Sequence, residues 1–200
     1  YAGACGGFMD IFGYPFCRGR VFDTLEKDNG QYDTPCKVFW ASGACLMVRR
    51  VDFVDYGGFD ENFFAHQEEI DLCWRINARG REVAVVPASV VYHLGGGTLS
   101  MQDARKTYLN FRNNHFLLYK NLSLGRWMLL SFFRFFLDYL AALAFVLRGK
   151  WKDAKAVVKA RIDFLRMKSK VRPLRKKNME HTICPRIPLV YHGSLLLNYH

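Results

Sequence analysis

A long apolar run near residue 130 constrains the fold of this chain more than any other feature. Residues 127–147 read WMLLSFFRFFLDYLAALAFVL, and a helix of this length matches the ~30 Å hydrocarbon core of a bilayer. Arg134 and Asp138 stand near its middle, one helical turn apart. A central charge costs roughly 2.5–3.5 kcal/mol on insertion scales, so this pattern disfavours a simple membrane span.

The charge distribution indicates where this run is placed instead. Residues 148–177 hold thirteen basic and two acidic residues, which accounts for the whole net charge of +11. A helix lying in the membrane interface, followed by a basic segment that meets anionic lipid, fits best. A buried helix of a globular domain and a transmembrane span are the alternatives. Aromatic and basic residues are segregated and not interleaved, which argues against nucleic acid as a partner.

The first part of the chain predicts an α/β domain. Residues 37–50 and 82–93 have β-type composition, the second run being interrupted by Pro87. Residues 67–79, with Gly80 as the C-cap, and residues 101–120 predict helices. The six cysteines lack the spacing of a zinc site, so we expect reduced thiols in a cytosolic compartment.

Three carboxylates lie within four positions at the start of the predicted helix 67–79: Glu68, Glu69 and Asp71. They admit a structural interpretation, because acidic residues in a first turn interact favourably with the helix dipole and Asp71 can pair with Arg75. They also admit a catalytic one, since a carboxylate within hydrogen-bond reach of a hydroxyl can act as general base. The helix alone leaves both interpretations open.

The order of motifs around this helix favours catalysis. The motifs are, in order, Ser42-Gly43-Ala44, Arg49, GGFDENFF from Gly57, EEIDLCWR from Glu68, Gly80 with Val83, and VYHLGGG from Val91. Over about residues 38–120 this order resembles the C-terminal half of the catalytic domain of family 2 glycosyltransferases, especially bacterial rhamnosyltransferase-like members.

The resemblance implies an α/β chain with a partial GT-A fold, lacking its N-terminal nucleotide-binding half and followed by C-terminal helices. It divides the chain into a transferase part at 1–122, amphipathic or interfacial helices with a basic tail at 123–177, and a C-terminal extension at 178–200. Without the nucleotide-binding half, the chain is expected to be unable to hold the donor properly and to be inactive alone.

The resemblance also implies a reaction. An inverting glycosyltransferase would move a sugar from a nucleotide-sugar donor to a lipid-linked or polysaccharide acceptor in cell-surface glycan synthesis. The general base falls on Glu69, where most members carry Asp, with Glu68 or Asp71 as stand-ins. Asp71 paired with Arg75 is expected to fix the helix, and Glu68 to supply a supporting hydrogen bond.

The remaining site residues are assigned by the same resemblance. His93 would lie near the metal and the donor diphosphate, with Gly95 and Gly96 in a loop that approaches phosphate. Arg112 and Asn113 would either contact the diphosphate or dock the next helix. The acceptor cleft would be lined by Trp40, Ser42, Gly43 and Ala44, burial in the core being the alternative for Trp40.

Cofactor, partners and location follow from this assignment. A divalent cation, Mg²⁺ or Mn²⁺, is expected near His93, with its Asp-x-Asp ligands outside this chain. The expected partners are the nucleotide sugar, the acceptor and an anionic membrane surface, and the expected location is peripheral, at the cytoplasmic face of the inner membrane. The alternative function is a non-catalytic segment that tethers a polysaccharide-assembly protein to a membrane or partner.

Overall fold

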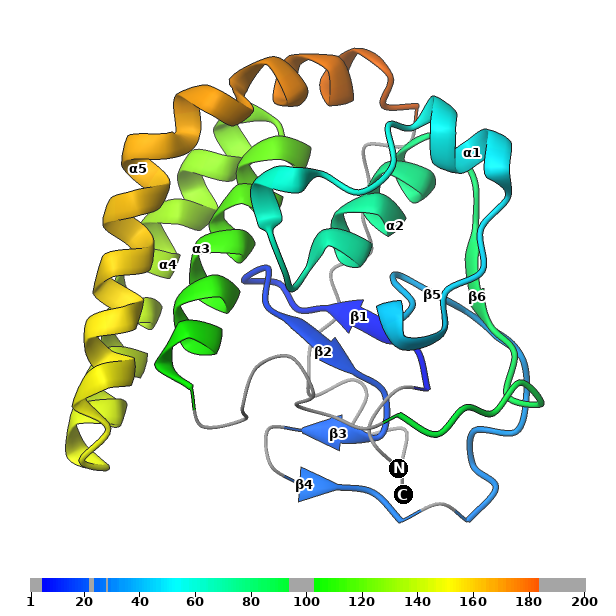
Figure 1. The fold of residues 1–200 in the computed structure, drawn as a ribbon, viewed down its shortest axis with the longest axis horizontal. Coiled ribbons are helices and arrows are strands. Elements are labelled where there is room, and N and C mark those ends of the chain that lie inside the picture. Colours follow the sequence, from blue (N-terminus) through cyan, green and yellow to red (C-terminus); the bar gives the residue numbers. More distant parts are fainter. Residues whose placement is uncertain (1–4, 22–23, 28, 94–102, 184–200) are drawn as a thin grey trace. The chain divides into compact units, whose positions relative to one another are not determined.

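The computed structural model describes residues 5–21, 24–27, 29–93 and 103–183 (Figure 1). These residues form two compact units, each with its own core. The first unit contains the described residues up to Phe59, those from Glu69 to His93, and those after Glu180. The second unit contains Asp60–Glu68 and the described residues from 103 to Glu180. The chain is therefore mixed α/β, as predicted, while the GT-A assignment and the boundaries at 122 and 177 stay predictions.

Short antiparallel strand pairs form the β structure of the first unit. Strand β1 (Gly7–Met9) pairs with β2 (Pro15–Cys17), and β3 (Arg20–Val21) pairs with β4 (Thr24–Leu25). Strand β5 (Cys36–Val38) pairs with β6 (Val83–Val85) in the register Lys37↔Ala84. A single bridge joins Gly7 to Trp40. The β5–β6 pair and the Gly7–Trp40 bridge join segments that are distant in sequence, and no larger sheet forms among the described residues.

The prediction of β structure over residues 37–50 and 82–93 was wrong for most of both runs. After β5 the chain forms the 3₁₀ turn η1 (Gly43–Cys45) and the helix α1 (Arg50–Asp55). The Ser42 hydroxyl accepts a hydrogen bond from the Ala44 N–H and so caps η1, because a serine side chain can replace the ladder partner of a strand. After β6, a turn follows at Pro87 and residues 89–93 are irregular, since proline cannot donate to a ladder.

The helix α2 (Glu68–Ala78) confirms the predicted helix 67–79 and carries much of the first core. Trp74 packs edge to face on Phe39, with ring centroids 5.3 Å apart. Asn77 Nδ2 donates to the Phe39 carbonyl at 2.8 Å. The helix ends at Gly80, whose φ of +77° is the left-handed conformation that favours glycine.

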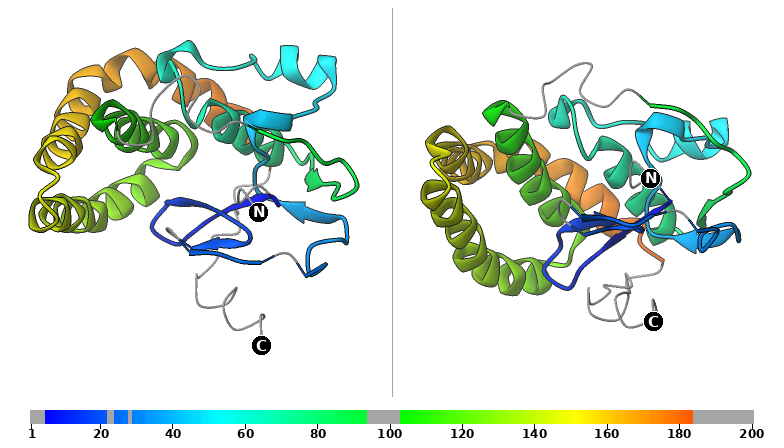
Figure 2. Two further views of the ribbon diagram at one scale, coloured as in Figure 1. Left: turned by 60° about the horizontal axis from the view of Figure 1, so that its bottom comes forward. Right: turned by 90° about the horizontal axis from the view of Figure 1, so that it is seen from below.

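Three long helices form most of the second unit: α3 (Ala104–Asn121), α4 (Leu124–Leu147) and α5 (Trp151–Glu180). They confirm the predicted helices 101–120 and 127–147, and the basic segment 148–177 is helical as well. A tight turn with Gly149 at φ +71° joins α4 to α5. Helix α5 then runs back along α4 and packs against α3 (Figures 1 and 2). Phe116 of α3 meets Phe164 of α5 in the buried core, with ring centroids 5.6 Å apart.

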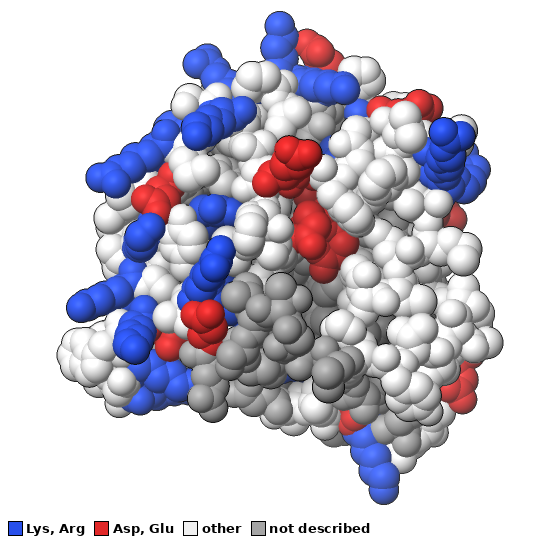
Figure 3. All heavy atoms as spheres, viewed as in Figure 1, with Lys and Arg blue, Asp and Glu red and all other residues white. Residues whose placement is uncertain are grey.

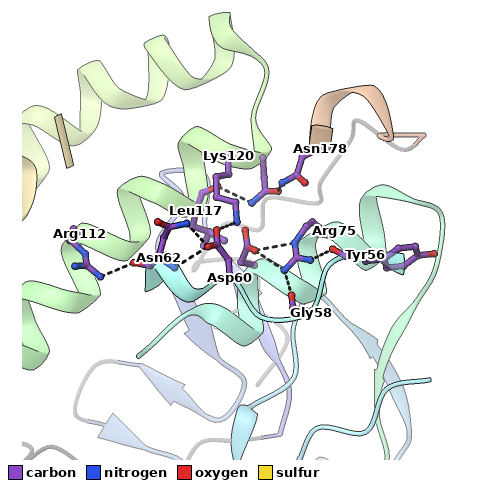
Figure 4. A network of polar contacts seen from close by, with 11 residues as sticks. Tyr56, Gly58, Asp60, Asn62, Arg75, Arg112, Leu117, Lys120 and Asn178 are labelled. Carbon is purple, nitrogen blue, oxygen red and sulfur yellow. Dashed lines mark hydrogen bonds and ion pairs between the residues drawn. The ribbon is translucent and has the colours of Figure 1, made fainter. Parts of the chain in front are cut away.

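The remaining element of the second unit is η2 (Glu61–Phe63), a 3₁₀ turn that precedes α2 in the chain. The Asp60 side chain caps it by accepting from the Asn62 N–H at 3.0 Å. Asp60 is also ion-paired with Lys120 of α3, whose side chain is 2% exposed (Figure 4). A buried ion pair therefore ties this turn to the helical core.

Candidate functional site

The carboxylates at the start of α2 have different environments. Asp71 is fully buried, and its Oδ2 lies 2.8 Å from Arg75 Nη2. Glu68 and Glu69 are partly exposed. Asp71 is therefore paired inside the core, whereas Glu68 and Glu69 lie nearer the surface. The pairing of Asp71 with Arg75 agrees with the structural role expected from the sequence.

Arg75 extends the buried ion pair into an anchor for the whole helix. Its guanidinium donates to the Asp71 carboxylate, to the Gly58 carbonyl at 2.7 Å, and to the Tyr56 carbonyl (Figure 4). Tyr56 directly precedes the Gly57-Gly58 turn, in which both glycines have positive φ. The pair consequently fixes α2 against the GGFDE motif and has a structural role.

Glu69 lies directly beside the predicted acceptor segment. A Cβ built on Gly43 would be 3.8 Å from Glu69 Cβ and 3.9 Å from its Cγ and Cδ. Gly43 and Ala44 are exposed, and Ser42 is held by its cap on η1. The fold therefore brings together Glu69 and the Ser42-Gly43-Ala44 turn, which the sequence predicted to share one site.

Two thiols, the partly buried Cys17 and the buried Cys73, interact electrostatically with Glu69. Burial raises the pKa of Cys17 to about 11; Arg20 opposes this rise, and the negative charge of Glu69 adds to it. Burial likewise raises the pKa of Cys73 to about 11, and Glu69 again contributes in the same direction. Both thiols thus stay protonated near neutral pH, so they do not compete with Glu69 as proton acceptors.

The loop that leads into α2 has an unusual backbone. Phe64, His66 and Gln67 adopt φ values of +64°, +71° and +72°. Side chains other than glycine rarely take this conformation, and each instance costs on the order of 1–3 kcal/mol. Strain of this kind persists only where the surroundings impose it, and it gathers at functional sites. Three such residues directly before Glu68 make this loop a separate candidate region within the second unit.

Helix α3 supplies the groups that hold this loop in place. Asn113 is fully buried, and its Nδ2 donates to the carbonyls of Phe63, Ala65 and His66 at 3.0, 2.7 and 2.7 Å. Arg112 Nη2 donates to the Phe63 carbonyl at 2.9 Å and to the Asn62 carbonyl at 3.1 Å (Figure 4). These bonds hold the loop before α2, whereas the two roles left open for Arg112 and Asn113, contact with the diphosphate or docking of the next helix, stay predictions.

Gln67 adds a bond in the opposite direction, from the loop to the helix. Its side chain is buried, and its Nε2 donates to the Asn110 carbonyl at 3.0 Å. The sequence did not single out Gln67, because nothing in its neighbourhood indicates that an amide would be turned inward. The hydrogen bonds in both directions together enforce the strained backbone.

The loop also presents polar atoms that the protein does not satisfy. Among the described residues, His66 Nε2 and Glu68 Oε2 are buried atoms with no hydrogen-bond partner. Burial lowers the pKa of His66, the Lys106 ammonium lowers it further, and Glu68 opposes both. Leaving a buried polar atom unpaired costs about 1–3 kcal/mol. His66 was missed by the sequence reasoning, which quoted it only as part of the loop.

The other predicted site residues divide into buried, exposed and undescribed positions. Trp40 is 7% exposed, its indole covers Gly7, and its Nε1 donates to the Phe8 carbonyl at 2.9 Å, so it has the core role that was the alternative. His93 is exposed. Gly95 and Gly96 lie outside the described residues, and their approach to phosphate stays a prediction.

The described residues do not fit a metal site by themselves. Within the parts of the chain that the structure describes, no three His, Cys, Asp or Glu side chains converge as metal ligands. The role of His93 as a metal neighbour therefore stays a prediction.

Comparisons with known proteins support the resemblance seen in the sequence. The profile of a family described as "Glycosyltransferase like family 2" matches residues 4–157, more than half of the chain. An N-acetylglucosaminyl-diphospho-decaprenol L-rhamnosyltransferase of Mycobacterium tuberculosis is 35% identical over 88 residues, which are 44% of this chain and 28% of that protein. Rhamnosyltransferase WbbL of Escherichia coli strain K12 is 38% identical over 69 residues, or 34% of this chain and 25% of that protein.

A third similar protein is larger. The O-antigen biosynthesis protein RfbC of Myxococcus xanthus is 29% identical over 94 residues, which are 46% of this chain and 7% of that protein. The chain thus spans less than a third of the length of each of these relatives. No solved structure matches significantly.

Proposed function

Because the chain belongs to the family 2 glycosyltransferases, we propose that it forms the acceptor-side part of an inverting glycosyltransferase with a GT-A fold. The base of the reaction is Glu69. The observation that supports this proposal is the closeness of the Glu69 side chain to Gly43: a Cβ at residue 43 would lie 3.8 Å from Glu69 Cβ, and Glu69 is partly exposed. A carboxylate beside a small, exposed turn leaves room for a sugar hydroxyl to approach it.

The chemistry requires a base because an acceptor hydroxyl has a pKa far above 7. It attacks the anomeric carbon well only as its proton leaves, and a carboxylate within hydrogen-bond reach accepts that proton. Of the three candidates, Asp71 is committed to Arg75 inside the core. We infer that Glu69 is the base, with Glu68 as its stand-in.

The donor is a nucleotide sugar, whose diphosphate leaves with growing negative charge. We expect His93 and the glycines after it to lie near this diphosphate. A divalent cation, when bound, offsets that charge. We propose that Asp-x-Asp residues would supply its ligands; the described residues form no group of three His, Cys, Asp or Glu that could hold it.

The acceptor is proposed from the names of the relatives. One acts on a decaprenol-linked sugar, another is named for O-antigen biosynthesis, and two are named as rhamnosyltransferases. We therefore propose rhamnosyl transfer to a lipid-linked acceptor in cell-surface glycan synthesis. We also propose a peripheral enzyme at the cytoplasmic face of the inner membrane, since a lipid-linked acceptor is held in a membrane.

A donor screen tests this function. The full-length protein would be incubated with membrane lipids and a panel of nucleotide sugars, with and without divalent metal, and sugar transfer to lipid measured. Glu69→Gln should reduce transfer by roughly 10²- to 10⁴-fold, with unchanged folding and donor binding. Glu82→Gln, at an exposed glutamate paired with Lys37, is the matched control. Retained turnover in Glu69→Gln would refute the base, and no transfer from any donor would favour the tethering alternative.

A further inference from the structure

Helix α4 turns its charges inward and its apolar side chains outward. Its buried residues are Arg134, Asp138 and Ala142, at 1%, 1% and 7% exposure, and they are spaced four apart on a single stripe. Arg134 and Asp138 are also the only charged residues between 128 and 147. The charges that disfavour membrane contact in the sequence are therefore absent from the outer face of the helix.

The inward stripe is paired within the helical unit. Arg134 Nε lies 3.1 Å from Asp138 Oδ1, and Arg134 also donates to the Asn114 side chain of α3. His115 Nε2 lies 3.2 Å from Asp138 Oδ2, and Arg161 Nη1 of α5 lies 3.5 Å from the same oxygen. These paired groups hold α4 against α3 and α5. Because they are paired inside the unit, they can stay buried when the outer face of α4 contacts lipid.

The outer face is a continuous surface of large apolar side chains. Its central members are between 46% and 62% exposed: Leu129, Phe132, Phe133, Phe136, Leu140 and Leu143. The uncharged face from 128 to 147 is about 30 Å long at the rise of an α-helix. Of the described helices, α4 is the one long and apolar enough to cross a membrane. Monomeric soluble proteins rarely expose contiguous apolar patches of this size.

The same helical unit carries the basic surplus of the chain. Exposed cations follow α5, among them Lys152, Lys155, Arg166, Lys170, Arg172 and Lys176, and Lys and Arg gather over the region of α5 in Figure 3. An apolar face accompanied by cations complements the acyl chains and the anionic headgroups of one lipid surface. A second copy of this equally basic chain would repel those cations, whereas an anionic lipid surface attracts them.

The packing of α5 along α4 also decides between lying on the bilayer and crossing it. A spanning α4 would carry the exposed lysines of α5 into the hydrocarbon, where ammonium groups are strongly disfavoured. We propose that α4 lies in the plane of an anionic bilayer, with its outer face among the acyl chains and the cations of α5 near the headgroups. The membrane proposal rests on the proposed function in one respect: a lipid-linked acceptor would lie in the same bilayer.

Vesicle flotation tests the proposal without any sugar present. Equimolar phosphatidylglycerol and phosphatidylcholine vesicles should bind the full chain, and phosphatidylcholine alone should bind it more weakly. The triple variant Phe132→Ser, Phe136→Ser, Leu140→Ser should weaken the partition constant by more than about tenfold, with an unchanged helical circular dichroism spectrum. The control triple Met47→Ser, Val51→Ser, Val54→Ser alters exposed apolar residues of the first unit and should bind like the wild type.

Two results would overturn the proposal. One is binding by the outer-face variant that equals the wild type. The other is a chain that does not bind vesicles but forms a dimer, where the same three serine substitutions dissociate that dimer. This result would assign the face to a second copy. Because no donor or acceptor is present, vesicle binding that persists when sugar transfer fails would count against the proposed function alone.

Discussion

Gly43 leaves open the space into which a side chain would project against Glu69: a Cβ at residue 43 would lie 3.8 Å from Glu69 Cβ. At that distance a methyl group makes ordinary van der Waals contact. Alanine should therefore fold normally but crowd the face of the proposed base.

We expect Gly43→Ala to lower kcat/KM for the acceptor while changing the free energy of unfolding by less than about 0.5 kcal/mol. Gly43→Val should lower it further. Steady-state kinetics and urea denaturation measure the two quantities. Gly125→Ala is the control, since nothing lies within 4 Å of a Cβ there and alanine favours a helix. Equal kinetics for Gly43→Val and the wild type would contradict a site at this turn.

Asn113 is expected to be essential for the strained loop. Asn113→Leu keeps the volume but removes the amide that donates to Phe63, Ala65 and His66. The free energy of unfolding should fall by about 2–4 kcal/mol, and amide exchange in residues 62–67 should speed up more than in α5. Asn29→Leu, at an exposed asparagine, should change stability little. Unaltered exchange in the loop of the Asn113 variant would argue that the loop is held by other contacts.

Arg75 should be much more important for stability than a surface cation. Arg75→Met leaves the Asp71 carboxylate buried without its partner, which costs about 3–5 kcal/mol. Arg75→Lys should lower the free energy of unfolding by an amount between zero and the loss in Arg75→Met. One ammonium cannot reproduce the forked contacts to Asp71, Tyr56 and Gly58. Lys37→Met breaks an exposed pair, with side chains 73% and 63% exposed, and should cost at most about 1 kcal/mol. Thermal unfolding ranks the three variants, and a Lys37 effect as large as that of Arg75 would contradict the ranking.

Stability should decline on the acid side because of His115. Burial lowers its pKa in the folded protein; the hydrogen bond to Asp138 opposes this shift, and Arg134 adds to it. The unfolded chain therefore takes up a proton near pH 6.5 that the folded chain accepts only at lower pH. The stabilising contribution is complete above about pH 6.5 and is lost as pH falls, by at most about 1.4 kcal/mol per pH unit.

Urea titrations at several pH values between 8 and 5 measure this slope. His115→Gln removes the titrating group, so its stability should depend less on pH across the same range, whatever its absolute value. Curves that stay parallel for the two proteins would show that other groups carry the acid response.

The parts of the site that depend on neighbours in sequence were predictable. The Asp71–Arg75 pair follows from a spacing of four on a helix, and the end of α2 follows from Gly80. The closeness of Glu69 to Gly43 is consistent with the family resemblance, which assigned the base to Glu69 and the acceptor cleft to the Ser42-Gly43-Ala44 segment. Residues 39–50 were predicted as a strand, but Ser42 caps a 3₁₀ turn there instead. Their composition alone did not distinguish these two structures, which differ in hydrogen bonding.

The parts imposed from a distance were not predictable. Nothing in FFAHQ indicates a left-handed backbone, since it contains neither glycine nor asparagine, and the groups that enforce it lie on α3. The orientation of Arg134 and Asp138 likewise depends on His115 and Arg161. A count of charges in the apolar run could not tell on which side of the helix they would lie.

The backbone of His66 and Gln67 limits how far this protein can be engineered for thermostability. Glycine would accept the same torsion angles without steric penalty, so a purely thermodynamic optimisation would select it at both positions. At residue 67 that exchange would delete the amide that bonds to Asn110, so the relief of backbone strain would be offset by a lost hydrogen bond. Improvements in heat resistance are better sought on the surface of α5.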